Sequence, residues 1–252
     1  MKSQDILEKR GYSVVKHNDL IQKSRYDLSA QEQRIILYLV SKIKPEDNDL
    51  HSYEFEIKEF CEVCGIDYDN GANYKYIKQT LKGLRDKSIW ITLENGKETT
   101  LAWIDKVTMD KRSGVVEIKI DDMMKPYLLQ LKEKFTKYSL YFTLALKSKY
   151  SIRLYEILKS YQKLEQCEFE IDHLKTMIDA ETHKLFANFK AKVLDIAVRE
   201  INDCSDILVS YELEKQGRKF NKIKFTLKPK FIEPIEESIR TWKNIEKILN
   251  KP

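Results

Sequence analysis

Histidine, cysteine and aspartate are the residues of this sequence whose spacing could support catalysis or metal binding. The four histidines stand apart, and none belongs to a His-x-His or His-Glu-x-x-His pair. Cys61 and Cys64 form one Cys-x-x-Cys pair without the further ligands of a structural zinc site, so we predict two half-buried thiols on a short helix. Asp121 and Asp122 are predicted to cap a helix over residues 123–134. The sequence therefore predicts no metal site.

Phosphate binding and DNA cleavage also lack their usual motifs. Gly96-Lys97 does not end a phosphate-binding P-loop, because Ile91 occupies the position where the first glycine would stand. A metal-dependent DNA nickase would need two histidines around an apolar residue, and the sequence has no such pair. We expect a protein without enzymatic activity and without a cofactor. A nickase or DNA-processing nuclease stays open as an alternative, which a cleavage assay with divalent metal would test.

The second half of the chain carries side chains suited to reading DNA on a helix predicted over residues 183–202. Amide groups pair with adenine in bidentate fashion, and lysine or arginine reaches guanine or phosphate. Ala191 and Asp195 share the predicted outward face with five candidate DNA readers. These are Lys184, Asn188, Lys190, Lys192 and Arg199. A solvated helix face is the competing interpretation.

A hairpin predicted after this helix would add further basic groups. Its strands are predicted over Ile207–Leu213 and Lys222–Leu227, and the turn contains Gln216-Gly217-Arg218-Lys219. Such a hairpin, called a wing when it follows a DNA-reading helix, lies against the DNA backbone or the minor groove. Its candidate contacts are Lys215, Arg218, Lys219, Lys222 and Lys224.

The first half has an equivalent helix, predicted over residues 73–87, but no excess of positive charge. Four basic residues, Lys75, Lys78, Lys82 and Arg85, lie opposite its apolar line. Residues 1–135 hold 23 Lys+Arg and 23 Asp+Glu, whereas residues 136–252 hold 22 and 17, so the whole net charge of +5 lies in the second part. The second half is therefore the predicted main DNA reader, and the first fits a weaker DNA contact or a protein interface equally well.

The elements that must position these side chains occur twice in the same order. In the first half, Ser29 and Glu32 form a capping box for a helix. After it we predict a strand over residues 53–57 and two helices over residues 58–64 and 73–87. Three β segments joined by turns follow, over residues 89–93, 101–109 and 115–120. In the second half we predict a helix over residues 148–164, a strand over residues 168–171 and a helix over residues 173–178 that Asp172 caps. The helix over residues 183–202 and the hairpin described above follow.

This repeated order predicts an α+β fold of two tandem winged-helix domains related by internal duplication. Phe55-Glu56-Ile57-Lys58-Glu59-Phe60 matches Phe169-Glu170-Ile171-Asp172-His173-Leu174 at an offset of 114 residues. Arg34-Ile35 likewise echoes Arg153-Leu154. We predict a first domain over residues 1–135, a second over residues 136–230 and a C-terminal helix within residues 231–252.

Composition limits where such a protein would work. Of its 252 residues, 42% are hydrophobic and 34% are charged. No run approaches the roughly 18–20 apolar residues of a membrane span, and the first residues form no signal-peptide core. We therefore expect a cytoplasmic protein without a membrane partner.

Two segments resemble a known family. The stretch from Lys147 to Lys159, which contains Tyr150-Ser151-Ile152-Arg153-Leu154-Tyr155-Glu156-Ile157-Leu158, resembles the start of the second domain in iteron-binding plasmid replication initiators with twin winged helices. The stretch from Leu28 to Arg34 resembles the first-domain helix of that family. The resemblance covers roughly residues 14–230.

The resemblance implies functions that the residue pattern alone does not give. Members of the family bind direct repeats, called iterons, in the double-stranded DNA of a plasmid origin, and they help to recruit the host initiator and the replicative helicase. Many form a homodimer through the first domain, and the dimer represses its own gene. A winged-helix transcriptional regulator without an initiation role is the alternative. Tandem repeats beside the gene would favour an initiator, and a lone palindrome would favour a regulator.

Overall fold

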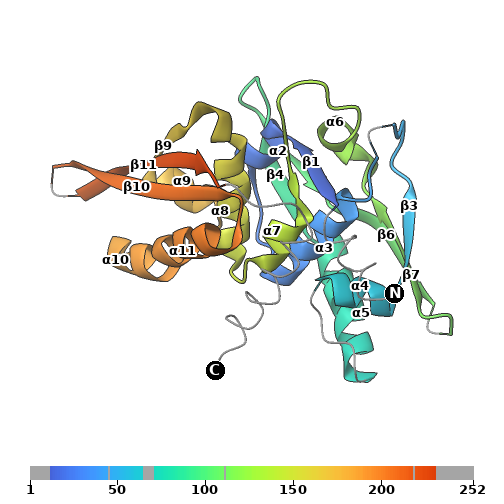
Figure 1. Cartoon of the computed structure of the whole chain (residues 1–252). Coiled ribbons are helices and arrows are strands. Elements are labelled where there is room, and N and C mark those ends of the chain that lie inside the picture. The colour runs from blue at the N-terminus through green and yellow to red at the C-terminus, as the bar shows by residue number, and fades with distance from the viewer. Residues whose placement is uncertain (1–11, 45, 65–70, 111, 218, 231–252) are drawn as a thin grey trace.

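The computed structural model describes residues 12–44, 46–64, 71–110, 112–217 and 219–230. Helices and strands are mixed throughout, which confirms the predicted α+β class. The chain forms two lobes, one on each side of the packed helices α3 (Ala30–Val40) and α8 (Lys149–Ser160), as Figure 1 shows. Each lobe carries one long basic helix. The contact between α3 and α8 therefore fixes the distance between these two basic helices.

The first lobe begins with β1, and α3 is its first long helix. Its capping box is confirmed: Ser29 Oγ accepts from the Glu32 amide at 3.2 Å, and a Glu32 carboxylate oxygen accepts from the Ser29 amide at 2.8 Å. The other elements up to residue 120 are β1 (Ser13–His17), α2 (Asn18–Gln22), β2 (Ser24–Arg25), β3 (Ser52–Glu56), α4 (Ile57–Cys64), α5 (Gly71–Arg85), β4 (Ser88–Thr92), β5 (Glu98–Ala102), β6 (Ile104–Asp110) and β7 (Val115–Ile120).

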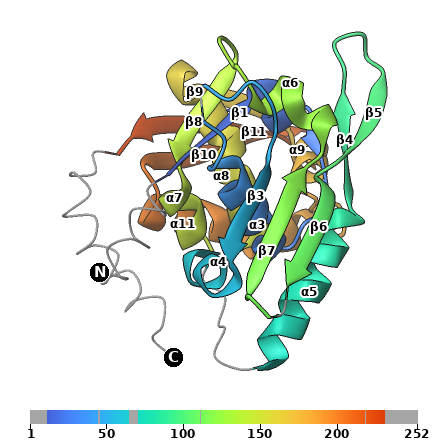
Figure 2. The ribbon, with the colours of Figure 1, turned by 90° about the vertical axis from the view of Figure 1, so that its right-hand side faces the viewer.

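The strand predicted over residues 101–109 is wrong in one respect, because the structure divides it between two sheets. Strand β5 pairs with β4, whereas β6 pairs with β7, so the sheets have the orders β2-β4-β5 and β3-β7-β6. Trp103 lies at the division with its side chain buried, and it packs edge-on against Tyr26 with ring centroids 5.1 Å apart. At Trp103 the chain passes from the sheet that contains β4 and β5 to the one that contains β6 and β7 (Figure 2).

The helix predicted over residues 123–134 is also shorter than expected. The Asp121 carboxylate does cap it, accepting from the Met123 amide at 2.8 Å. A 3-10 turn (Asp122–Met124) and α6 (Lys125–Leu128) follow, and the helix then ends. Gln130 has a left-handed φ of 50°, and the chain continues as β8 (Phe135–Ser139), which pairs antiparallel with β1. This pairing joins strands more than 100 residues apart in the sequence.

The second lobe repeats the order of the first. Its elements are α7 (Leu140–Ala145), α8, β9 (Gln166–Glu170), α9 (Ile171–Met177), α10 (Phe186–Phe189), a π-helical turn (Lys190–Leu194), α11 (Asp195–Cys204), β10 (Ile207–Gln216) and β11 (Lys219–Pro229). Strands β10, β11 and β9 form one antiparallel sheet in the order β10-β11-β9. Asp172 does not cap α9 as predicted, because the helix already begins at Ile171 and Glu170 occupies the N-cap position.

The internal repeat predicted from the sequence occupies equivalent places in the two lobes. In the first lobe a strand ends at Glu56 and a helix begins at Ile57; in the second a strand ends at Glu170 and a helix begins at Ile171. The offset at this junction is the 114 residues found in the sequence. The apolar members of the repeat are buried in both copies, which explains why the local sequence is similar.

The two lobes exchange arginine contacts, one partly buried and one buried, through the equivalent helices α3 and α8. Arg34 on α3 donates from Nη2 to the Leu146 carbonyl oxygen at 2.7 Å. Arg153 on α8 is 3% exposed and donates to the carbonyl oxygens of Ile21 and Ser24 at 2.7 and 2.8 Å. Because each arginine satisfies backbone carbonyls of the opposite segment, the contact between the lobes is specific as well as apolar.

A buried ion pair reinforces the same contact. Lys16 on β1 donates from Nζ to Glu156 Oε1 on α8 at 2.6 Å, and the side chains are only 3% and 1% exposed. The Tyr138 hydroxyl on β8 donates to the same Glu156 oxygen. Burial opposes the ionisation of Glu156, yet Lys16 and Arg153 outweigh it and hold the pKa of Glu156 below its usual value. Burial lowers the pKa of Lys16, and the neighbouring Glu156 carboxylate opposes that shift.

Candidate nucleic-acid interface

The predicted reading helix of the second lobe is present, with a later start than residue 183. It runs through α10, the π-helical turn and α11, from Phe186 to Cys204, and Lys184 lies in the loop before it. Phe189, Val193, Ala197 and Ile201 are buried against the lobe. These buried positions hold one side of the helix inward, so its opposite side must face solvent.

Four of the predicted DNA readers lie together on that exposed side. Lys184, Asn188, Lys192 and Arg199 are all exposed, and we call them the outer stripe. Asn188, Lys192 and Arg199 lie on the helix at intervals of four and seven residues, and Lys184 lies in the loop four residues before Asn188. The stripe places one amide and three cations where a groove of DNA could meet them.

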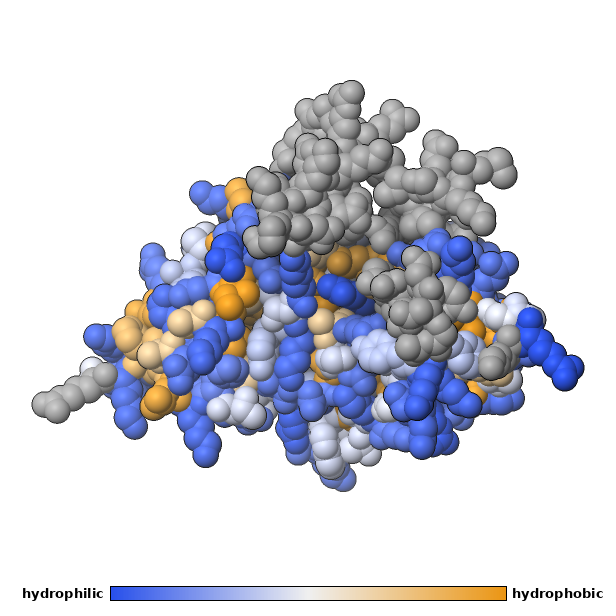
Figure 3. All heavy atoms as spheres, turned by 90° about the horizontal axis from the view of Figure 1, so that it is seen from below, coloured by the Kyte–Doolittle hydropathy of each residue, from blue (hydrophilic) through white to orange (hydrophobic). Residues whose placement is uncertain are grey.

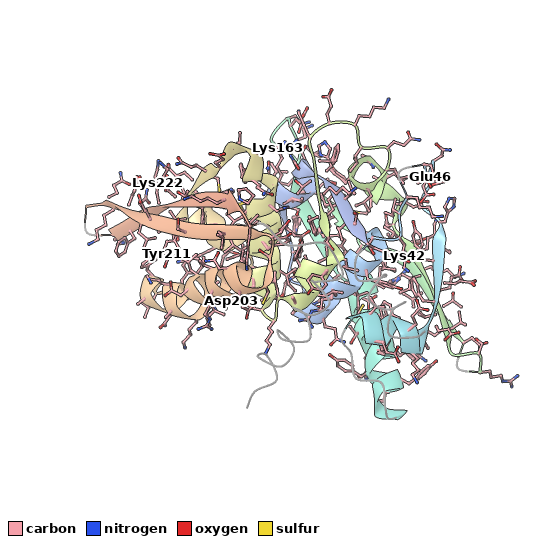
Figure 4. The ribbon with its side chains drawn as sticks, in the orientation of Figure 1. Lys42, Glu46, Lys163, Asp203, Tyr211 and Lys222 are labelled. Atoms are coloured by element: carbon pink, nitrogen blue, oxygen red, sulfur yellow. The ribbon has the colours of Figure 1, made fainter. Side chains whose placement is uncertain are left out.

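Lys190 differs from the outer stripe because it is paired within the lobe. Its ammonium group lies 2.8 Å from Asp195 Oδ2, and the Tyr211 hydroxyl donates to Asp195 Oδ1 at 2.5 Å. The hydrogen bond to Asp195 raises the pKa of Lys190. The pair spans the π-helical turn, and Tyr211 lies between the helix and the hairpin in Figure 4. Lys190 therefore joins the helix to the wing.

The hairpin β10–β11 forms the wing, and its turn contains basic residues. Lys215 and Lys219 are exposed near this turn, where Gly217 has a positive φ of 65° that suits glycine. Arg218, also predicted to contact DNA, lies outside the described residues. The Phe220 ring packs at a tilt against Phe186 at the start of α10, with centroids 4.8 Å apart, so the wing tip is held beside the reading helix.

Lys222 and Lys224 occupy a different face of the wing. Ile223 and Phe225 are buried against the lobe, so the lysines that alternate with them point to the other side of the sheet. Lys222 Nζ lies 2.6 Å from Glu168 Oε1, and Glu212 and Glu214 stand opposite Lys224 and Lys222 on β10. Figure 4 shows Lys222 on the side of the sheet away from α10 and α11.

This placement gives a testable difference between two wing lysines. Changing Lys222→Gln is expected to leave DNA affinity within about twofold, because its charge already faces glutamates on the far side of the sheet. Changing Lys219→Gln at the tip should weaken binding by roughly three- to tenfold through the loss of a phosphate contact. Fluorescence anisotropy with a labelled duplex would measure both. Equal losses for the two variants would contradict the assignment.

The first lobe exposes its own basic helix, α5. Lys75, Lys78, Lys82 and Arg85 are exposed, while Ile77, Leu81 and Leu84 are buried on the opposite side. In Figure 1, α5 is the lowest element of one lobe, and α10 and α11 are the lowest of the other. Figure 3 looks onto this lower face, where the described side chains are mainly hydrophilic. Both basic helices therefore border the same side of the molecule.

The two cysteines of the Cys-x-x-Cys pair are packed in the core of the first lobe. Cys61 and Cys64 lie on α4 as predicted, although they are fully buried where half-burial was expected. Burial raises the pKa of the Cys61 thiol to about 12, which keeps it protonated at neutral pH. Across residues 12–44, 46–64, 71–110, 112–217 and 219–230, no group of three His, Cys, Asp or Glu side chains is arranged to hold a metal ion. No helix in those ranges is both long and apolar enough to cross a membrane.

The fold and the two exposed basic helices define a tandem winged-helix protein. The family model described as "Initiator Replication protein, WH1" matches residues 13–159, and the one described as "Initiator Rep protein, WH2" matches residues 170–227. The chain belongs to the initiator replication protein family, and its two tandem winged-helix domains are confirmed. The first match extends through α8, past the division predicted after residue 135; the predicted domain limits stay a prediction.

Three Escherichia coli proteins are similar to this chain over part or most of its length. A "Replication initiation protein" is 28% identical over 217 residues, which cover 81% of this chain and 66% of that protein. An uncharacterised protein is 20% identical over 219 residues, covering 81% and 91%. The "PI protein" is 30% identical over 148 residues, covering 51% and 48%. The chain thus spans less than two thirds of the first and third of these relatives.

Proposed function

We propose that the protein initiates replication of plasmid DNA by binding direct repeats at the origin, with α10 and α11 in the major groove. The observation that carries the proposal is the outer stripe, in which Asn188 stands among three exposed cations, two on the same helix and one in the loop before it. An amide can read adenine, while the cations reach guanine or phosphate. The protein binds and positions DNA without cutting it, and it acts in the cytoplasm.

The arrangement of the lobes supports binding by a single copy of the chain. Helices α5 and α10–α11 border the same side of the molecule, and the buried pair of Lys16 and Glu156 holds the lobes together. A rigid connection of this kind lets α5 add contacts along the same duplex. The Escherichia coli relative named for replication initiation supports the same role.

The remaining parts of the proposal concern partners. Host initiator and helicase would assemble on the DNA-bound protein. A homodimer formed through the first domain would repress the gene for the protein. These parts rest on the family, whereas the DNA contact rests on the side chains described above.

A footprint on DNA flanking the gene tests the DNA contact. We expect protection of tandem repeats in one orientation, with one copy of the chain on each repeat. A single protected palindrome would instead favour a transcriptional regulator of the same fold. A nick that depends on divalent metal would contradict a protein without enzymatic activity.

Salt dependence provides a second measurement. Lys184, Lys192, Arg199, Lys215 and Lys219 are exposed cations of the reading helix and wing tip. If they neutralise about five phosphates, the logarithm of the binding constant should fall with the logarithm of salt with a slope of roughly −4 to −5. Anisotropy titrations over a range of salt concentrations would measure the slope. A slope close to zero would contradict the predicted phosphate contacts.

A further inference from the structure

A basic hollow lies where the segment before β8 meets the C-terminal end of α8. It encloses about 360 Å³. Its lining contains five lysines and one glutamate, which makes it strongly positive. The charged and aromatic lining residues are Lys132, Glu133, Lys134, Phe135, Lys137, Lys159 and Lys163. We call this site the basic hollow.

Most of its lysines have no internal partner. Lys159 is largely buried, and its ammonium group lies 2.5 Å from Asp206 Oδ2. The other four lysines are exposed, and none forms an ion pair with another residue in the part of the chain that the structure describes. Like charges that converge on one hollow repel one another, so an anionic partner would relieve an unfavourable arrangement.

The floor of the basic hollow is held in place by hydrogen bonds. Lys134 has a left-handed φ of 51°, and its carbonyl oxygen accepts from the Asn18 amide at 2.6 Å. Asn18 Oδ1 in turn accepts from the Thr136 hydroxyl at 2.7 Å. A residue other than glycine keeps a left-handed conformation only where its surroundings impose it. The backbone that carries Lys134 is therefore fixed by the fold.

Large apolar side chains add a second kind of contact. Phe135 lines the basic hollow and is 41% exposed, and Leu164, next in sequence to the lining residue Lys163, is 69% exposed. A partner that offered only charge would leave both of these side chains in water. The chemistry therefore suits a partner that carries carboxylates together with an apolar group.

The basic hollow faces away from the proposed DNA contact. Figure 4 places Lys163 at the top of the molecule, whereas Asp203 on α11 lies on the lower side. The duplex proposed to lie along α5 and α10–α11 would occupy that lower side. The basic hollow would thus stay accessible while DNA is bound.

We propose that the basic hollow docks an acidic segment of a partner protein. Carboxylates of the segment would pair with Lys132, Lys134 and Lys163, and an apolar side chain would pack against Phe135. The compact volume and the apolar rim favour a peptide over a nucleic acid, because a strand of nucleic acid is bound along an extended basic groove. This surface is separate from the outer stripe, so the inference does not depend on the proposed DNA readers.

A peptide-binding experiment tests the proposal with matched variants. The probe is a fluorescein-labelled peptide of glutamates around a central Leu-Phe pair. Changing Lys132, Lys134 and Lys163 together to Gln should weaken peptide binding at least about tenfold, while repeat DNA is bound as before. The control changes Lys44, Lys97 and Lys106 to Gln, which removes the same charge from exposed positions outside the basic hollow, and should change peptide affinity less than twofold. Phe135→Ala should weaken peptide binding about threefold.

The outcomes separate the possible occupants. Loss of peptide binding in the Lys132/Lys134/Lys163 variant alone, with DNA binding kept, supports the proposal. Equal losses in both triple variants would show a nonspecific charge effect and overturn it. Single-stranded oligonucleotide that displaces the peptide would assign the basic hollow to nucleic acid. Self-association of the unmodified protein that is lost in the Lys132/Lys134/Lys163 variant would assign the basic hollow to a second copy of the chain. Displacement by oligonucleotide and self-association would each overturn the proposal. Failure of repeat-DNA binding in the unmodified protein would count against the proposed function alone.

Discussion

Reversal of the charges of Lys190, Lys192 and Arg199 to glutamate is expected to abolish specific DNA binding. Lys192 and Arg199 belong to the outer stripe, and a base or phosphate contact of this kind contributes about 1–3 kcal/mol. The three carboxylates would also repel the DNA backbone. We expect a loss of at least about a hundredfold in affinity for repeat DNA, measured by anisotropy at one fixed salt concentration.

The structure assigns unequal shares to the three positions. Lys190 is paired with Asp195 at 2.8 Å, so Lys190→Gln alone should weaken binding only slightly, by about threefold or less. Lys192 and Arg199 together should carry most of the loss. The matched control reverses Lys44, Lys97 and Lys106, which lie outside the reading helix and the wing. An unchanged footprint of the Lys190/Lys192/Arg199 variant on repeat DNA would refute the assignment of the reading helix.

Removal of Glu156 is expected to have the largest effect on stability. Glu156→Ala would leave the buried Lys16 ammonium group without its counter-ion and the Tyr138 hydroxyl without its acceptor. Breaking a buried ion pair in this way typically lowers the free energy of unfolding by about 3–5 kcal/mol. We also expect the urea midpoint of unfolding to fall.

Two further variants distinguish a lost ion pair from a lost side chain. Lys16→Met combined with Glu156→Gln removes both charges and keeps an acceptor for Tyr138, so it should recover most of the stability. Lys119→Met breaks an exposed pair with Asp122 and should cost less than about 1 kcal/mol. If Glu156→Ala were no more destabilising than Lys119→Met, the buried pair could not be what joins the lobes.

Much of the local structure could be predicted because short-range patterns determine it. The capping box of Ser29 and Glu32 involves residues three apart, and the repeat that begins at Phe55 and Phe169 marks a strand-to-helix junction in both lobes. Helical spacing likewise identified Asn188, Lys192 and Arg199 as exposed positions of one helix, whereas Lys184 lies in the loop before it. Periodicity of three to four residues is a local property of the chain, so it can be recognised in the sequence without knowledge of the segment that packs against it.

Predictions that depended on distant partners were less complete. The strand predicted over residues 101–109 was divided because Trp103 packs against Tyr26, far earlier in the chain. Lys222 was grouped with the wing tip, although cross-strand neighbours place it among glutamates on the opposite face. The sequence shows which residues alternate along a strand, but the partner strand decides which charges meet across it.

The sequence by itself therefore determined the class of fold, the duplication of its basic unit and the exposed basic side of each reading helix. Only the tertiary structure decided how the two units are joined. Lys16 and Glu156 are separated by 140 residues, and no local pattern connects them. Tertiary packing also brought Lys132, Lys134 and Lys163 to one basic hollow on the side away from α11. Burial and charge pairing act between residues that are close in space, whereas propensity and periodicity act along the chain.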